Sequence, residues 1–253
     1  MKQLIFAHRG ASGYAPENTL EAFELAVRQG ADGIELDVHM TREGELVVAH
    51  DETIDRVADG SGAICEMTLA ELKRYHFNRT KPEYRSARIP TLLEVFELVG
   101  PSDLMINVEL KNSYIDYPGL EKAALELAAR IGMEDRVLYS SFNHHSLLRI
   151  KQLNPKAFCG MLYEATLIEP WKYASLHGMD ALHPHFSEMN VPGEAQNAHA
   201  LGLKVNVWTP NAPRFWELCL RAGADILITD FPDQALRFRD EFHKAQSGTI
   251  HSV

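Results

Sequence analysis

One repeated pattern constrains the fold more than any other feature of the chain: an amphipathic helix, a glycine and then a short strand. Residues 25–37 read LAVRQGADGIELD and residues 218–230 read LCLRAGADILITD, so both follow the frame L-x-x-R-x-G-A-D-x-x-x-x-D. Looser copies occur around Gly132, Gly178 and Gly202. Helices often end at a left-handed residue, which glycine adopts without strain. A single glycine indicates only a helix end, but five followed by strands predict repeated β–α units.

This pattern predicts eight strands, near residues 4–8, 33–38, 105–110, 137–141, 157–162, 181–184, 204–208 and 226–229. Helices are expected between them, near residues 18–29, 91–99, 119–131, 144–153, 168–176, 193–201, 212–222 and 232–242. Eight such units in 253 residues fit an α/β fold of the (β/α)8 TIM-barrel type. A doubly wound open sheet is the main alternative. It is expected to carry a glycine-rich phosphate loop, and the sequence contains neither GxGxxG nor GxxxxGK[ST].

One stretch, approximately residues 40–90, departs from this rhythm because barrel loops are usually much shorter. It contains a hairpin-like return at residues 41–44, leading into GELVVAH, and a short helical piece, MTLAELKRY. We expect a small insertion after strand 2 that lies over the C-terminal mouth of the barrel. No composition change marks a linker, so residues 1–253 are expected to form a single TIM-barrel domain.

The composition argues against several classes of protein. A net charge of −10 opposes nucleic-acid binding through a basic face. The three cysteines, Cys65, Cys159 and Cys219, form no CxxC pair, which favours a reducing compartment. The apolar run at residues 4–7 is too short for a signal peptide, and no run approaches the ~20 apolar residues of a membrane span. We therefore expect a cytoplasmic protein without stable membrane insertion or a nucleic-acid partner, of undetermined oligomeric state.

Three acids on two of the expected strands are predicted to meet inside the barrel. Side chains alternate along a strand, so Glu35 and Asp37 of GIELDV point opposite to its apolar residues. The same alternation turns Asn107, Glu109 and Lys111 of MINVELK inward. Three carboxylates in one narrow interior do not all stay ionised without a cation. Their oxygen-only chemistry favours Mg²⁺ or Ca²⁺, with Mn²⁺ as a further candidate.

Two histidines and two cations are expected beside these acids. His8 closes the first strand and His50 closes LVVAH, and near neutral pH one imidazole can hold a proton while the other accepts one. Arg9 and Lys111 would supply positive charge for a phosphate, and Arg9 would bind it in a bidentate manner. In the alternative interpretation, Arg9 and Lys111 only pair with the acids in a structural network.

Several other residues are weaker candidates. His39 continues the second strand and is expected to point outward. His183 and His185 flank Pro184 at a strand end, so one of them is a candidate for substrate contact. Residues 16–19, PENT, are typical of a helix start rather than of a functional site.

The ordered motifs resemble one known family, the glycerophosphodiester phosphodiesterases. They run from about residue 5 to 233 and read HRGASGYAPENTLEAF, GADGIELDVHMTREGELVVAHDETIDR, IPTLLEVFEL, VELK, VNVWTPN and GADILITDFP. The signatures H-R-G, E-x-D, H-D and E-x-K, in this order, are specific. The chain is most similar to the bacterial cytosolic members, which implies a hydrolase of glycerol and lipid metabolism.

The resemblance also implies roles for individual residues. It implies a divalent metal, Mg²⁺ or Ca²⁺, on Glu35, Asp37 and Glu109. It implies that His8 and His50 act as the acid and base, and that Arg9 and Lys111 hold the substrate phosphate. Phe142 and Trp208, which end strands and could equally belong to the core, correspond to positions that border the glycerol. The implied reaction hydrolyses a small glycerophosphodiester to sn-glycerol 3-phosphate and an alcohol.

Three other functions are considered. A lysophospholipase D-type phosphodiesterase on the same barrel is the closest, and it should present an apolar surface for acyl chains. A Schiff-base aldolase would use Lys111, but Glu109 on the same face favours a paired lysine instead. A non-catalytic metal or phosphate-binding module would be favoured by missing acid and base histidines, and both are present.

Overall fold

The computed structural model describes residues 2–249 of the chain. Its strands are β1 (Leu4–His8), β2 (Gly33–Met40), β3 (Leu46–Val48), β4 (Met105–Leu110), β5 (Val137–Ser141), β6 (Phe158–Tyr163), β7 (Ala181–Pro184), β8 (Lys204–Trp208) and β9 (Ile226–Thr229). Its α-helices are α1 (Leu20–Arg28), α2 (Leu69–Leu72), α3 (Leu92–Val99), α4 (Leu120–Arg130), α5 (His144–Leu153), α6 (Pro170–Leu176), α7 (Glu194–Ala200), α8 (Pro213–Ala222) and α9 (Pro232–Thr249). Short 3-10 turns lie at η1 (Ile64–Glu66), η2 (Glu134–Arg136) and η3 (Phe186–Asn190).

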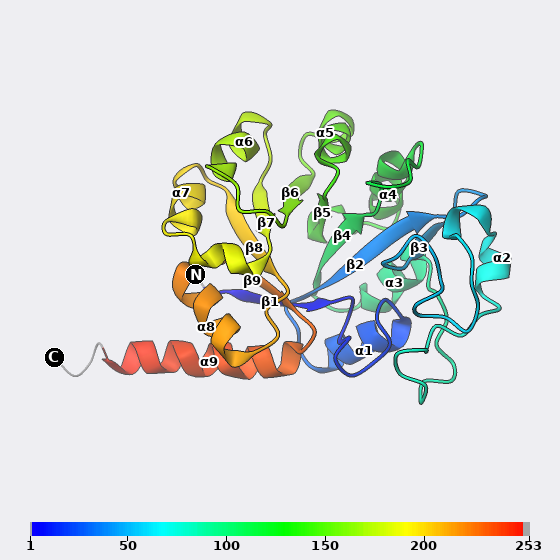
Figure 1. The fold of residues 1–253 in the computed structure, drawn as a ribbon, viewed down its shortest axis with the longest axis horizontal. Coiled ribbons are helices and arrows are strands. Elements are labelled where there is room, and N and C mark those ends of the chain that lie inside the picture. The colour runs from blue at the N-terminus through cyan, green and yellow to red at the C-terminus, as the bar shows by residue number, and fades with distance from the viewer. Residues whose placement is uncertain (1, 250–253) are drawn as a thin grey trace.

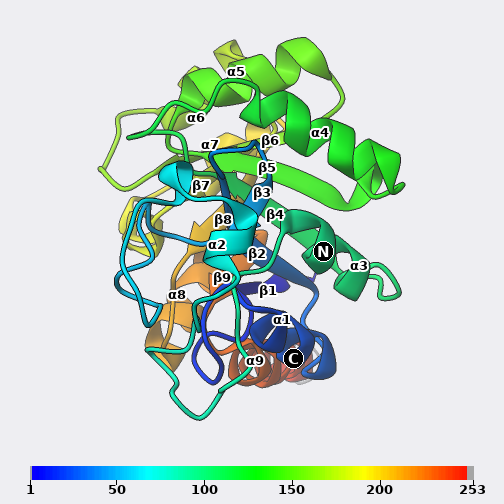
Figure 2. The same ribbon diagram turned by 90° about the vertical axis from the view of Figure 1, so that its right-hand side faces the viewer.

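The strands close into a barrel. Their order is β1-β9-β8-β7-β6-β5-β4-β2-β3, and an additional pairing between β1 and β2 completes the ring. All neighbouring strands of the ring are parallel, while β3 joins β2 antiparallel. In Figure 1, α4 to α7 lie along one side of the strands and α1, α8 and α9 along the other, and Figure 2 shows helices surrounding the strands. The predicted (β/α)8 TIM barrel is confirmed, and each predicted strand overlaps one of its strands.

The repeated glycines serve the purpose predicted for them. All five adopt positive φ angles, namely Gly30 (75°), Gly132 (68°), Gly178 (68°), Gly202 (77°) and Gly223 (94°). Each therefore turns the chain in the left-handed conformation between a helix and the following strand. The last helix extends further than predicted, to Thr249 instead of about residue 242. No helix among residues 2–249 is long and apolar enough to cross a bilayer.

The apolar strand residues pack between the sheet and the helices, as alternation predicts. On β2 these are Ile34, Leu36 and Val38, all fully buried in the main hydrophobic cluster. This outer packing leaves the opposite face of the strand for the barrel interior. The core therefore fixes which side chains point inward.

Residues 41–91, called the insertion below, follow β2 and return to the barrel at Thr91. The strand β2 extends to Met40 because its last residues pair with β3, Val38 opposite Val48. The insertion has a small apolar cluster of its own, formed by Val47, Ala49, Ile54, Val57, Ala58, Ile64, Leu72, Phe77 and Ile89. Figure 1 shows β2 pointing toward it, and in Figure 2 its helix α2 lies in front of the strands.

Candidate active site

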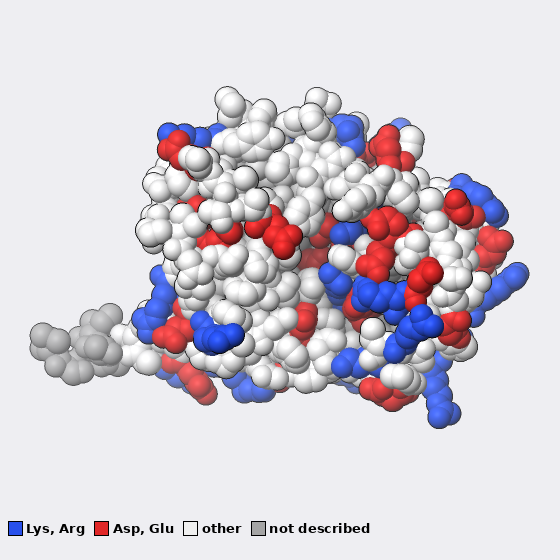
Figure 3. Space-filling model, viewed as in Figure 1, with Lys and Arg blue, Asp and Glu red and all other residues white. Residues whose placement is uncertain are grey.

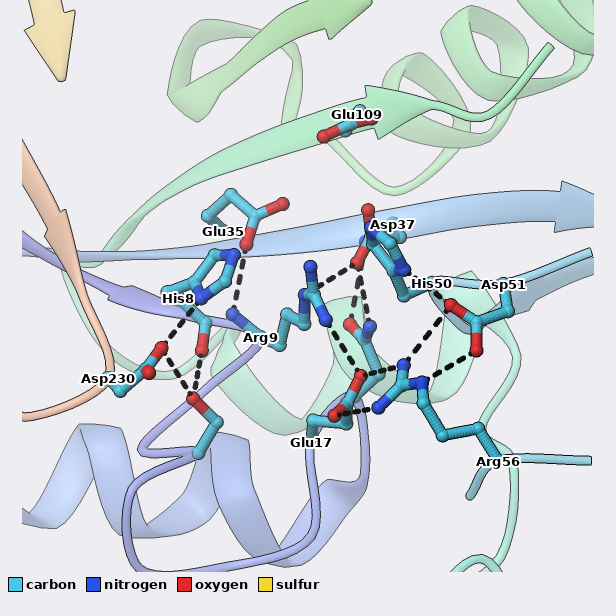
Figure 4. A network of polar contacts seen from close by, with 12 residues as sticks. His8, Arg9, Glu17, Glu35, Asp37, His50, Asp51, Arg56, Glu109 and Asp230 are labelled. Carbon is cyan, nitrogen blue, oxygen red and sulfur yellow. Dashed lines mark hydrogen bonds and ion pairs between the residues drawn. The ribbon is translucent and has the colours of Figure 1, made fainter. Parts of the chain in front are cut away.

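The three predicted metal ligands lie together on two neighbouring strands. The register of β2 and β4 places Asp37 beside Glu109 and Glu35 beside Asn107. Glu35 and Asp37 are only 4% and 1% exposed. One ligand oxygen from each of Glu35, Asp37 and Glu109 lies within 4.8 Å of the others. Figure 4 shows Glu109 facing Glu35 and Asp37 from the adjacent strand.

Burial and mutual repulsion act strongly on these acids. Burial raises the pKa of Glu35 well above its ordinary value, and the charges of Asp37 and Glu109 raise it further. Burial also raises the pKa of Glu109, although Lys111 partly opposes this. Burial alone would raise the pKa of Asp37, but the charges of Arg9 and Lys111 lower it below the ordinary range. The site therefore favours either a protonated Glu35 or an added cation.

Arg9 is held in this cluster by both its backbone and its side chain. Its backbone N–H donates to Glu35 Oε2 at 2.9 Å, its Nη1 donates to Glu17 at 2.9 Å and its Nε lies 3.4 Å from Asp37. Burial by itself lowers the pKa of Arg9, but the nearby carboxylates raise it above its ordinary value. Its φ of 54° is rare for a residue other than glycine, and such backbone strain concentrates at functional sites. The next residue is a glycine, Gly10, and a Cβ at this position would lie 2.6 Å from the backbone of Ala22.

The segment 16–19 contributes more than the predicted helix start. Thr19 does cap α1 by accepting from Ala22 N–H. Asn18, with a φ of 57°, donates to Asp37 Oδ2 at 2.8 Å, and Glu17 accepts two 2.7 Å bonds from Arg56 of the insertion. The sequence showed no spacing that pairs these residues with the acids, because the pairing depends on how the β1–α1 loop folds back.

Lys111 lies where alternation predicted it. Its Nζ is 2.8 Å from Glu109 and 3.6 Å from Asp37. Burial by itself lowers the pKa of Lys111, but these two carboxylates raise it above its ordinary value. The ion pairs of the structural-network interpretation are therefore present.

These ion pairs do not neutralise the cluster. Five carboxylates share a connected network with three cations: Glu17, Glu35, Asp37, Asp51 and Glu109 with Arg9, Arg56 and Lys111. With all five carboxylates ionised the network has an excess of two negative charges, which one divalent cation would compensate. Asp37 Oδ1 is also buried without a hydrogen-bond partner. The donor set therefore fits a hard divalent ion.

His8 at the end of β1 is oriented by an acid from the last strand of the barrel. Its Nδ1 lies 2.6 Å from Asp230 Oδ1 (Figure 4). Asp230 also accepts from Ser12 at 3.1 Å and from Asn211 at 2.6 Å. Burial alone would raise the pKa of Asp230, but the hydrogen bond from His8 lowers it. No role was predicted for Asp230. Its position in the repeated frame, equivalent to Asp37, was the available signal.

His50 comes from the insertion and has a similar partner. Its Nδ1 lies 2.6 Å from Asp51 Oδ1, and Arg56 Nε donates to Asp51 Oδ2 at 2.6 Å.

The prediction that His39 points outward is wrong. Its buried ring lies 3.0 Å from Tyr117 Oη and 3.1 Å from the backbone oxygen of His50. His39 shares the strand parity of Asp37, so strict alternation would have placed it correctly.

A small cavity, called the inner cavity below, lies between these groups. Its volume is about 50 Å³, and it is lined by His8, Arg9, Glu35, His50, Asn107, Glu109, Phe142, Leu162, Trp208 and Ile228. Phe142 and Trp208 meet edge to face with ring centroids 5.6 Å apart. Both amide atoms of Asn107 are buried without a hydrogen-bond partner, which is typical of groups that await a ligand or water. His183 is not among the lining residues; burial lowers its pKa to about 3, and its Nε2 lies 2.8 Å from Asn206.

Comparison with known proteins identifies the family. The model of the glycerophosphoryl diester phosphodiesterase family matches residues 8–234. The chain belongs to this family. It is 41% identical to a glycerophosphodiester phosphodiesterase of Caldanaerobacter subterraneus, over 92% of this chain and 96% of that protein. It is also 41% identical to one of Bacillus altitudinis, over 94% and 98% of the two chains.

The solved structure of another phosphodiesterase shares the fold. A phosphodiesterase of Oleispira antarctica, in complex with the product sn-glycerol-3-phosphate, has a TM-score of 0.86 and 32% identity, covering 94% of this chain and 97% of that one. The predicted family and its enzyme class, phosphoric diester hydrolase, are therefore confirmed. The individual roles of the site residues remain predictions.

Proposed function

We propose that the chain hydrolyses glycerophosphodiesters to sn-glycerol 3-phosphate and an alcohol. The observation that carries the proposal is a pair of histidines, each bound to an aspartate, beside an acid cluster with excess negative charge. Named relatives with the same activity support the substrate class. We further propose that residues 1–253 act as one catalytic domain, because the insertion supplies His50 and Asp51 to a site whose other residues come from the barrel.

Glu35, Asp37 and Glu109 would hold the metal. Their oxygen donors favour Mg²⁺ or Ca²⁺, with Mn²⁺ as a further candidate. When bound, such an ion supplies Lewis-acid stabilisation for the charge that develops on the phosphate oxygens. Arg9 and Lys111 contribute fixed positive charge beside the same oxygens, and their carboxylate partners hold them there without the substrate.

His8 and His50 would act as the acid and base. With each Nδ1 bound to an aspartate, Nε2 is the nitrogen that exchanges a proton with the substrate. One histidine removes a proton from the nucleophile and the other protonates the departing alkoxide. The nucleophile is water or the glycerol 2-hydroxyl, and the second route produces a cyclic phosphate that water then opens. Phosphorus NMR of the reaction mixture distinguishes the routes by a cyclic product.

The dimensions of the inner cavity favour a substrate without an acyl chain. A lysophospholipid carries its acyl chain on the glycerol, and about 50 Å³ accommodates only a few water-sized groups. Exposed apolar side chains do lie on the loops after β4 and β6, Tyr114 at 89% and Ile168 at 94% exposure, as a lysophospholipase D-type enzyme would require. Product analysis on glycerophosphocholine and lysophosphatidylcholine separates the two activities.

The decisive assay is release of glycerol 3-phosphate from a panel of glycerophosphodiesters, each with Mg²⁺, Ca²⁺ or Mn²⁺. We expect turnover with at least one metal and a glycerol 3-phosphate product in every productive reaction. A folded protein that released no glycerol 3-phosphate from any member of the panel would overturn the proposed function.

A further inference from the structure

A second cavity, called the outer cavity below, opens beside the inner one. Its volume is about 520 Å³, and it shares four lining residues with the inner cavity, namely His50, Glu109, Phe142 and Trp208. A diester held at the two histidines therefore has one end in each cavity. The inner cavity is lined by the proposed metal ligands Glu35 and Glu109, and with the glycerol end of the substrate placed there the leaving alcohol lies in the outer cavity.

Two carboxylates without ion pairs line the outer cavity. Glu52 belongs to the insertion and Glu164 to the loop after β6. Within residues 2–249, neither side chain has a hydrogen-bond or ion-pair partner. The cation in the lining, Lys111, is paired with Glu109. The charge that the outer cavity offers to a ligand is therefore negative.

The same cavity carries exposed aromatic rings. Phe142 is 41% exposed and packs edge to face on Trp208 with an interplanar angle of 85°, while Tyr114 is 89% exposed. Aromatic faces combined with negative charge recognise quaternary ammonium groups, because the ring quadrupole attracts the cation and the ring surface covers its methyl groups. In Figure 3 many of the charged side chains on this face lie over the insertion, and the surface over α5 to α7 is largely uncharged.

We propose that the outer cavity selects a leaving alcohol that carries a quaternary ammonium group, as choline does, over neutral alcohols of the same shape. Glu52 and Glu164 supply the charge, and Tyr114, Phe142 and Trp208 supply the ring surfaces. This inference rests on the proposed glycerophosphodiester hydrolysis. It assigns the leaving-group preference to loops outside the metal and histidine cluster.

The test compares glycerophosphocholine with its neutral isostere, the glycerophosphodiester of 3,3-dimethylbutanol, which replaces the charged nitrogen with carbon. We expect kcat/KM for the choline diester to be about 10-fold higher, within the range that a partly desolvated cation on aromatic rings contributes. The preference should decrease as salt rises, because the carboxylate contribution is screened. Equal kcat/KM values, with glycerol 3-phosphate released from both, would overturn the inference and leave the proposed function intact.

The double variant Glu52→Gln, Glu164→Gln tests the assigned residues. The ratio of the two kcat/KM values should fall by about two- to threefold per carboxylate removed, which leaves the part of the preference that the rings contribute. Glu24→Gln, on the exposed side of α1, is the matched control and should keep the wild-type ratio. An unchanged ratio in the double variant would overturn the assignment. Failure of the wild type to hydrolyse either diester with any of the three metals would overturn this inference together with the proposed function.

Discussion

The two histidines of the site come from separate segments but have the same kind of support. His8 ends β1 and His50 belongs to the insertion, and in each the Nδ1 lies 2.6 Å from an aspartate oxygen. The aspartates differ in their other partners. Arg56 binds Asp51, whereas neutral groups, Ser12 and Asn211, bind Asp230. Each imidazole is thereby fixed in one tautomer, with Nε2 available for chemistry.

Replacing either histidine should remove most of the activity. His8→Ala and His50→Ala are each expected to lower kcat by about 10²- to 10⁴-fold, the usual contribution of a general acid or base. Glycerol 3-phosphate release measures the loss, and circular dichroism checks that the variants fold. Near-wild-type kcat in both folded variants would contradict the acid and base assignment.

Asp230 is expected to act as a positioning residue through His8. In Asp230→Asn the amide can donate to Nδ1 and stabilise the wrong tautomer, so we expect kcat to fall about 10- to 100-fold. The pH profile of kcat should shift as well, and Asp230→Glu should restore part of the activity. Asp233→Asn, in the adjacent turn of α9, is the control and should keep the wild-type kcat and the wild-type pH profile. A loss without a changed pH profile would indicate a structural role alone.

At the scale of the strands, the repeated Gly-x-Asp units have a mechanical explanation. Asp32, Asp180 and Asp225 precede β2, β7 and β9, and each accepts a backbone N–H from the neighbouring strand, at 2.8, 2.8 and 2.9 Å. Each also binds a cation, Arg239, Lys151 and Lys204 respectively. The aspartates thus join adjacent strands at their amino ends, opposite the active site.

Removing one of these aspartates should destabilise the barrel in a pH-dependent way. Burial alone would raise the pKa of Asp225, but hydrogen bonds from Lys204 and His199 lower it below its ordinary value. A carboxylate with a lowered folded-state pKa stabilises the protein above its unfolded pKa of about 3.9 and loses this effect as pH falls through the folded value. Asp225→Asn should therefore cost about 1 kcal/mol of unfolding free energy at neutral pH and less at about pH 3. Urea unfolding at both pH values measures this, and equal losses would contradict the linkage.

For the whole molecule, the site concentrates negative charge in a protein whose net charge is already −10. A bound divalent ion should therefore stabilise the fold as well as support turnover. Chelation is expected to abolish activity, and Mg²⁺ or Ca²⁺ should restore it. An ion at 100 times its dissociation constant should add about 2.7 kcal/mol to the unfolding free energy.

Thermal unfolding with and without the ion measures this stabilisation independently of activity. Glu109→Gln removes one carboxylate oxygen donor from the site and should reduce the shift. Undiminished turnover after exhaustive chelation would remove the metal from the mechanism.

Local patterns in the sequence were enough to predict the barrel and most of its interior. The 2-residue period of β2 and β4 predicted that Glu35, Asp37 and Glu109 face inward, and the five glycines predicted where helices end. His39 follows the same period as Asp37, so its predicted outward orientation conflicts with the pattern of its own strand. These features are predictable because they depend on near neighbours in the chain.

The supporting contacts depended on the tertiary structure. His8 and Asp230 are separated by 222 residues, and they meet because β1 pairs with β9 when the barrel closes. Arg56 reaches Glu17 only because the insertion folds back over the β1–α1 loop. Pattern along the chain specified which residues face the interior. The closure of the barrel and the path of its long loop decided which of them touch, because neither leaves a periodic signal in the sequence.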